Sequence, residues 1–189
     1  MAIIVVGGSS KGVGKTTLVC GLIAALDSLR WTAVKITTDA HEGLPPVCEE
    51  KSAGPETDTA RYLAAGAERA FLLTVPPQCD LGEALNEFWP LIGRAANLIF
   101  ESNRVAGHVS ADVCLLVQGD PCADESKPSF FRAAKFADAL VAQGDDDLMV
   151  ADAMKWEGPP RGPIFNLKQL DRISEEMKSW LKQRPGLTL

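Results

Sequence analysis

The segment GGSSKGVGKTT, residues 7–17, contains the residue types that bind the phosphate groups of a nucleotide. Gly12 and Gly14 allow backbone conformations and a close approach that a side chain would block. Successive backbone N–H groups and the N-terminus of a following helix can then face an anion. Lys15 can reach the β and γ phosphates, and the hydroxyl of Thr16 can ligate Mg²⁺. The predicted phosphate-binding residues are Ser10, Lys11, Gly12, Val13, Gly14, Lys15, Thr16 and Thr17.

This loop departs at one position from the common pattern G-x-x-x-x-G-K-[ST]. The first glycine should be residue 9, but that residue is Ser9, and Gly8 lies one place earlier. Either Ser9 replaces the glycine or the loop is one residue longer. An apolar strand before the loop and a helix after it favour a nucleotide site over a glycine-rich turn that binds nothing.

Lys11 adds a second lysine to the loop. In partition and arsenical-pump ATPases, a signature lysine lies five residues before the loop lysine and reaches the nucleotide of a facing subunit. Lys11 lies only four residues before Lys15, and Ser10 occupies the signature place. We therefore interpret Lys11 as a surface lysine near the phosphates.

Acidic residues follow several predicted strands, at the end of the sheet where ligands bind in open α/β proteins. Glu101 ends NLIFE, Asp39 follows WTAVKIT, and Asp120 follows CLLVQG. A carboxylate there can hold Mg²⁺ or orient an attacking nucleophile, and the alternative is a solvated charge. We favour function for Glu101 and Asp39 and leave both interpretations open for Asp120. The predicted catalytic residues are Lys15, Asp39 and Glu101, and the predicted Mg²⁺ ligands are Thr16 and Glu101, directly or through water.

Other polar residues carry weaker signals. Arg61 and Arg104 could neutralise phosphate charge, although exposed arginines are common on helices and loops. The helix that contains Arg61 could instead simply pack, with Tyr62 directed inward. His41 and Cys48 have no C-x-x-C or H-x-x-x-H spacing, so we do not predict a metal site there.

Strands and helices alternate along the chain, and the strands are apolar throughout. This combination predicts a three-layer α/β fold, with a mostly parallel sheet and helices on both faces, in one domain over residues 1–189. The predicted strands are 2–7, 31–37, 69–75, 97–101, 112–118 and 138–143, with weaker candidates at 148–151 and 162–165. The predicted helices are 16–29, 58–67, 81–95 with Pro90 kinking or interrupting it, 128–136, and a last helix capped by Asn166 and stopped by Pro185-Gly186. The span 39–57 is expected to be a long loop.

Composition limits the partners and the location. The chain has 189 residues and a formal net charge of −6, which disfavours nucleic acid and anionic membranes as partners. No apolar run approaches the roughly 18 residues of a membrane span, and no basic region precedes the first apolar run as in a secretory signal. Five cysteines without a C-x-x-C spacing favour a reducing cytoplasm.

The ordered segments GVGKTTLV, TAVKITTDAHE, TDTARYLAAGAERAFLL, NLIFESN, DVCLLV and DALVAQGD resemble the molybdopterin-guanine dinucleotide biosynthesis protein B (MobB) family from residue 3 to about 180. The resemblance implies a P-loop NTPase that binds GTP with Mg²⁺, hydrolyses it slowly, assists a partner enzyme of molybdenum cofactor biosynthesis and forms a homodimer. By matching motif, Gly12, Gly14, Lys15, Thr16 and Thr17 would carry the phosphates and Mg²⁺.

Glu101 would take the place of the glutamate in the family's Glu-Gly-Phe-Lys segment. That segment reads ESNR here, with Arg104 as its basic residue, and the family's paired histidines are reduced to His41. GTP is favoured over ATP by the resemblance alone, because no Asn-Lys-x-Asp sequence is present near VAQGDDD.

Two other functions fit the same loop. One is an ATP-dependent small-molecule kinase or a dethiobiotin-synthetase-like ligase, in which residues 39–57 would close over an acceptor that Asp39 orients. The other is a non-catalytic module whose loop senses nucleotide. The sequence names neither the acceptor nor the partner.

Overall fold

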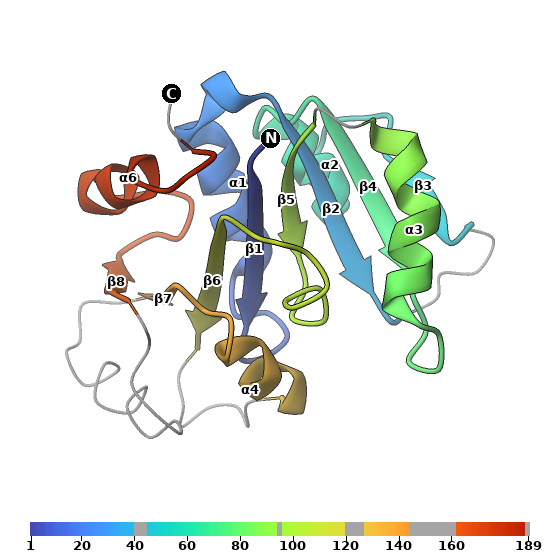
Figure 1. The fold of residues 1–189 in the computed structure, drawn as a ribbon. Coiled ribbons are helices and arrows are strands. Elements are labelled where there is room, and N and C mark those ends of the chain that lie inside the picture. Colours follow the sequence, from blue (N-terminus) through green and yellow to red (C-terminus); the bar gives the residue numbers. More distant parts are fainter. Residues whose placement is uncertain (40–44, 94–95, 120–126, 144–161, 188–189) are drawn as a thin grey trace.

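The strands that the structure describes belong to one sheet, in the order β3-β4-β2-β5-β1-β6-β7-β8. The structure is a computed structural model that describes residues 1–39, 45–93, 96–119, 127–143 and 162–187 (Figure 1). The strands are β1 (Ile3–Gly8), β2 (Trp31–Thr37), β3 (Val47–Glu49), β4 (Arg69–Thr74), β5 (Asn97–Glu101), β6 (Val113–Gln118), β7 (Ala139–Gln143) and β8 (Ile164–Leu167). Every neighbouring pair is parallel except β3 and β4. The prediction of a mostly parallel sheet is confirmed.

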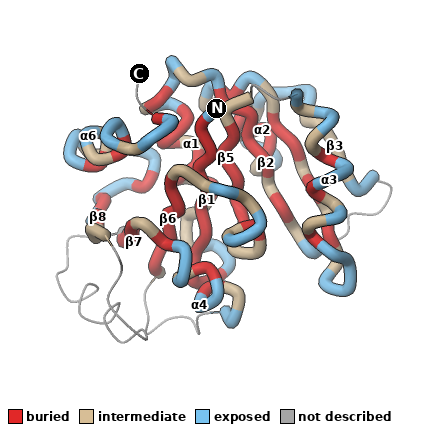
Figure 2. Tube along the Cα trace, in the orientation of Figure 1, coloured by how far each residue is buried: buried red, intermediate tan, exposed pale blue. Residues whose placement is uncertain are grey.

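Helices cover both faces of this sheet (Figure 1). They are α1 (Lys15–Ala25), α2 (Asp58–Ala64), α3 (Leu81–Ile92), α4 (Pro128–Ala134) and α6 (Glu175–Lys182). Ile4 and Val6 of β1 pack with residues of α1, α2 and α6, whereas Ile3 and Val5 pack with α3. This alternation buries both faces of the central strands (Figure 2), so the three-layer α/β architecture is also confirmed.

The segment 39–57 differs from its prediction as an unbroken loop. Val47–Glu49 forms the short edge strand β3, antiparallel to β4. Arg69 of β4 donates a hydrogen bond of 2.7 Å from Nε to the carboxylate of Glu49, which fixes the two strands together. A strand of three residues is too short for an alternating pattern to stand out among prolines and charges.

The last helix starts later than predicted. Asn166 lies within β8, and the N-cap is Ser174, whose Oγ accepts a hydrogen bond of 3.2 Å from the N–H of Met177. The prediction of an Asn166 cap is therefore wrong. The apolar spacing suggested one continuous helix, but its residues lie in β8, in the connecting segment and in α6, which share one core. Its members Leu167, Leu170, Ile173, Met177 and Leu181 are all buried.

Two other helix boundaries also differ between the prediction and the structure. Helix α1 ends at Ala25 instead of residue 29, and a separate 3-10 turn covers Asp27–Leu29. Helix α3 continues through Pro90 to Ile92. The strand candidate at 148–151 lies outside the described residues. Within the described ranges, none of the helices has the length and apolar character needed to cross a membrane.

Candidate functional site

The loop between β1 and α1 has the backbone conformation that its glycines suggest. Gly12 and Gly14 have φ angles of 81° and 95°, in the left-handed region that favours glycine. A Cβ added at Gly14 would lie 2.2 Å from Cδ1 of Leu170, so this position also lacks room for a side chain. The loop leads directly into α1, whose first residue is Lys15.

Ser9 and Gly8 have separate structural roles at the start of the loop. The buried hydroxyl of Ser9 accepts a hydrogen bond of 3.0 Å from the N–H of Gly119, and the N–H of Ser9 donates to the carbonyl of Val117 at 2.9 Å. Ser9 thus ties the loop to the end of β6. A Cβ at Gly8 would lie 2.7 Å from Cγ1 of Val13, so Gly8 supplies the close approach.

A cavity of about 520 Å³ opens beside this loop, at the carboxyl ends of the central strands. Cationic side chains outnumber carboxylates along its wall, although the whole chain carries a net charge of −6. Such a wall suits a polyanion like a triphosphate. The cations are Lys11, Lys15, Lys35, Arg61, Arg104 and Lys127, and the carboxylates are Asp39, Asp58 and Glu101.

Lys15 lies within this cavity and folds back on the loop, where Nζ donates a hydrogen bond of 2.7 Å to the carbonyl of Ser10. Burial lowers the pKa of Lys15, the nearby Lys127 and Lys35 lower it further, and Glu101 opposes them. A desolvated ammonium group among other cations gains most from an anionic ligand. This environment matches the phosphate-binding role predicted for Lys15.

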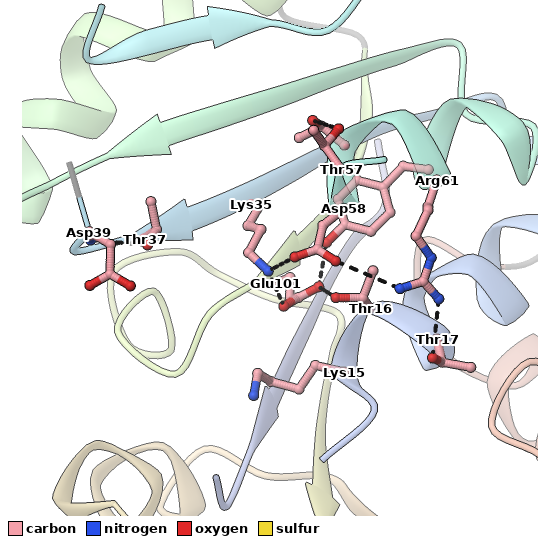
Figure 3. Close-up of polar contacts among 12 residues, drawn as sticks. Lys15, Thr16, Thr17, Lys35, Thr37, Asp39, Thr57, Asp58, Arg61 and Glu101 are labelled. Carbon is pink, nitrogen blue, oxygen red and sulfur yellow. Dashed lines mark hydrogen bonds and ion pairs between the residues drawn. The ribbon is translucent and has the colours of Figure 1, made fainter. Parts of the chain in front are cut away.

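Glu101 lies beside the loop because β5 pairs with β1. In this pairing Glu101 is in register with Val6. The hydroxyl of Thr16 donates a hydrogen bond of 2.7 Å to Oε2 of Glu101 (Figure 3). The hydroxyl of Tyr62 donates to the same oxygen. Glu101 is only 4% exposed. The structure thus brings together the two residues predicted to hold Mg²⁺.

Lys35 and Asp58 complete this cluster, and neither of them was predicted from the sequence to belong to the site. Lys35 lies opposite Glu101 in the β2–β5 register, and its Nζ is 3.0 Å from Oε1 of Glu101. It also pairs with Asp58, the first residue of α2 (Figure 3). Burial alone would lower the pKa of Lys35, but Glu101 and Asp58 outweigh it and raise that pKa. Burial alone would raise the pKa of Asp58, but Lys35 holds it below its ordinary value.

The remaining predicted residues lie around the rim. Arg61 donates a hydrogen bond of 3.3 Å to Oγ1 of Thr17, whereas exposed Asp39 lines the cavity with its N–H bound to Thr37. Lys11 is exposed on the same wall, as its prediction as a surface lysine requires. Arg104 lines the cavity too, but its guanidinium donates to the carbonyls of Val75 and Cys79.

Some residues considered from the sequence do not join this cluster. Cys48 lies on β3, away from the loop, and His41 and Asp120 lie outside the described residues. Across the described part of the chain, no group of three His, Cys, Asp or Glu residues is arranged to hold a metal ion.

Two further site residues were also missed. Lys127 precedes α4 and lines the cavity. Asn103 accepts a hydrogen bond of 2.7 Å from the N–H of Gly8 and donates to Ser129 at 3.2 Å. A charged residue inside an apolar strand was the available signal for Lys35, whereas Asp58, Lys127 and Asn103 become recognisable only once the strands are placed side by side.

Among the comparisons with known proteins, the one with solved structures supports the fold. No protein-family model and no curated protein matches the sequence. Among solved structures, HypB from Helicobacter pylori, in complex with nickel, is 18% identical with a TM-score of 0.60, over 95% of this chain and 85% of that one. LpxK from Aquifex aeolicus, in complex with ATP, is 15% identical with a TM-score of 0.52, over 88% of this chain. The chain spans about half the length of LpxK, at 53%.

A MobB protein homolog from Bacillus stearothermophilus also matches, with 18% identity and a TM-score of 0.46 over 96% of this chain and 95% of that one. These structures are P-loop NTPases. The likeness to HypB and LpxK shows that this chain shares their P-loop NTPase fold.

Proposed function

We propose that this chain is a Mg²⁺-dependent GTP-binding protein that hydrolyses GTP slowly, the activity implied by the resemblance to MobB. The observation that carries the proposal is the hydrogen bond from Thr16 to buried Glu101 within a cavity rich in cations. This geometry joins the end of the phosphate loop to an acidic residue on the neighbouring strand.

The oxygen atoms at this point have the chemistry that Mg²⁺ requires. The hydroxyl of Thr16 and the carboxylates of Glu101 and Asp58 are hard oxygen donors. They belong to one hydrogen-bonded cluster, joined through Lys35. We propose Thr16 and Glu101 as the metal ligands, directly or through water, with Asp58 as an additional candidate. When bound, the metal neutralises charge on the β and γ phosphates.

The other side chains around the proposed metal ligands would bind the phosphates and orient the attacking water. Lys15 would bind the β and γ phosphates, and the N–H groups of the loop would surround them. Glu101 already accepts hydrogen bonds from Thr16, Tyr62 and Lys35. Asp39, on the rim, is therefore the better placed carboxylate for orienting an attacking water.

The test is nucleotide binding with Mg²⁺, measured for GTP and ATP on the wild type and on Lys15→Ala. We expect a preference for GTP, and a loss of roughly ten- to a hundredfold in affinity for the variant, because a buried charge-assisted contact is removed. Lys135→Ala removes an exposed cation that does not line this cavity and is the matched control, with a change of a few-fold at most. Absence of binding by both nucleotides would refute the proposal.

A second cavity favours one alternative, ATP-dependent phosphoryl transfer to a small acceptor. This cavity of about 490 Å³ lies between β3 and the start of α2. It shares Lys35, Asp58 and Arg61 with the first cavity, so an acceptor bound there would lie next to the phosphate site. A preference for ATP, with turnover stimulated by one member of a panel of small hydroxyl and amine acceptors, would establish this alternative in place of GTP hydrolysis.

The resemblance also leads us to propose a partner enzyme of molybdenum cofactor biosynthesis and a homodimer, and the cysteine pattern leads us to propose a cytoplasmic location. The four cysteines in the described ranges are free thiols, which suits a reducing compartment. Sedimentation of the protein with and without GTP and Mg²⁺ tests the dimer directly.

A further inference from the structure

The ammonium group of Lys35 lies between two carboxylates at the centre of the proposed metal site. Its Nζ is 3.0 Å from Oε1 of Glu101 and also pairs with Asp58 (Figure 3). The side chain of Lys35 is 24% exposed and Glu101 is 4% exposed, so water screens this pair weakly. Lys35 thus neutralises carboxylates that are proposed to face a divalent cation.

A cation bound to Glu101 would compete with this ammonium group. Oε2 of Glu101 accepts hydrogen bonds from Thr16 and Tyr62, and Oε1 accepts one from Lys35. Two positive groups within a few ångströms of one partly buried carboxylate repel each other strongly. Lys35 must therefore move away from Oε1 when a divalent cation is bound there.

A destination for Lys35 exists within the same cavity. Lys35 and Lys15 both line the wall of this cavity. The two ammonium groups therefore face a common space beside the phosphate loop. An anionic terminal phosphate in that space would give Lys35 a new partner in exchange for Glu101.

We infer that Lys35 is a built-in substitute for the metal: it occupies the cation position between Glu101 and Asp58 in the nucleotide-free protein and exchanges this position for a contact with the terminal phosphate. This inference rests on the proposed function. Two consequences follow from this inference. The metal alone binds weakly, because it must displace Lys35 without compensation, whereas the metal and the triphosphate bind cooperatively.

The first arm of the test uses Mn²⁺ alone, with the free ion counted by electron paramagnetic resonance. Lys35→Met keeps an unbranched side chain that is one atom shorter and removes its charge. We expect Mn²⁺ to bind this variant at least about tenfold more tightly than the wild type, because Glu101 and Asp58 lose their internal cation. Lys135→Met makes the same change of charge at an exposed lysine that does not line this cavity, and it is expected to change Mn²⁺ affinity less than about threefold.

The second arm measures GTP affinity in saturating Mg²⁺ on the same three proteins. Lys35→Met is expected to bind GTP at least about fivefold more weakly, because the terminal phosphate loses a cation. A merely structural lysine would, on removal, weaken both Mn²⁺ and GTP binding. The inference thus requires effects of opposite sign, and Mn²⁺ affinity that is unchanged or reduced in Lys35→Met overturns it.

Two measures keep the outcome interpretable. Thermal unfolding is recorded for each variant, and Lys35→Gln, which retains a hydrogen-bond donor, replaces Lys35→Met if that variant fails to fold. The same opposite signs are expected for Lys35→Gln. Because the Mn²⁺ arm needs no nucleotide, failure of the wild type to bind GTP would refute the proposed function, while an unchanged Mn²⁺ affinity would refute the role of Lys35.

Discussion

The hydroxyl of Tyr62 donates a hydrogen bond to Oε2 of Glu101, so helix α2 is fixed to the acidic residue of the proposed phosphate site. Tyr62 is fully buried, at 0% exposure, and burial raises the pKa of its phenol well above the ordinary value. The same helix contributes Asp58 and Arg61 to the cavity wall. Helix α2 therefore positions several charged groups at once.

Tyr62→Phe tests this connection. It keeps the buried ring and removes one donor from a buried carboxylate, so we expect the free energy of unfolding to fall by about 1–3 kcal/mol. Urea titration followed by circular dichroism provides the measurement. Nucleotide affinity without Mg²⁺ should stay near the wild-type value, because the hydroxyl contacts Glu101 and not the loop. An unchanged urea midpoint would show that this hydrogen bond contributes nothing.

The two loop glycines make a matched comparison. Gly14→Ala places a methyl group 2.2 Å from Leu170 at a φ of 95°, whereas at Gly12 the described residues leave 4 Å of open space and only the φ of 81° opposes alanine. We expect Gly12→Ala to lower the free energy of unfolding by about 1–2 kcal/mol, from the left-handed backbone alone. Gly14→Ala should lose clearly more, because Leu170 must also move. Equal urea midpoints for the two variants would contradict the close packing of Leu170 on the loop.

The pair of Arg69 and Glu49 predicts a pH dependence of stability. Hydrogen bonds from Arg69, and then from Lys51, lower the pKa of Glu49 from 4.5 to about 2. A carboxyl whose pKa is depressed in the folded state contributes its stability fully above the ordinary pKa and loses it as the pH falls toward the folded value. The contribution of Glu49 should therefore disappear as the pH falls from about 4.5 to about 2.

Glu49→Gln isolates this contribution from that of other carboxylates, such as Asp58. The difference in unfolding free energy between wild type and Glu49→Gln should be largest at pH 6 and should shrink at pH 3. A difference that stays constant over this range would show that the Arg69 contact does not depend on the charge of Glu49. The measurement is a set of urea titrations at each pH.

The sequence predicted the elements in which a single pattern dominates. The apolar runs of β1, β2 and β5 became buried parallel strands, and Trp31–Thr37 matches its predicted bounds. Strand β3 escaped prediction because it depends on pairing with the edge of β4, which a local pattern cannot show. The prediction of an Asn166 cap was wrong because residues suited to a helix cap are common outside caps. Asn166 instead belongs to β8, which pairs with β7.

The site was predictable to the extent that it follows from a motif. Lys15, Thr16 and Glu101 follow from loop spacing and from the position of an acid at a strand end, and the fold places them together. Lys35 and Asp58 were missed for a physical reason. The charge of Lys35 inside an apolar strand is visible in the sequence, but its partner Glu101 is known only from the sheet register.

The most direct test of the central claim is the Mg²⁺ dependence of GTP affinity in the wild type and in Glu101→Gln. Glutamine keeps the size of the side chain and removes the charge that a metal would need. We expect Mg²⁺ to raise the GTP affinity of the wild type by at least about tenfold and to have little effect on Glu101→Gln. Asp39→Asn, which alters an exposed carboxylate on the same cavity wall, should retain the full Mg²⁺ effect. An equal Mg²⁺ effect in the wild type and Glu101→Gln would contradict the account.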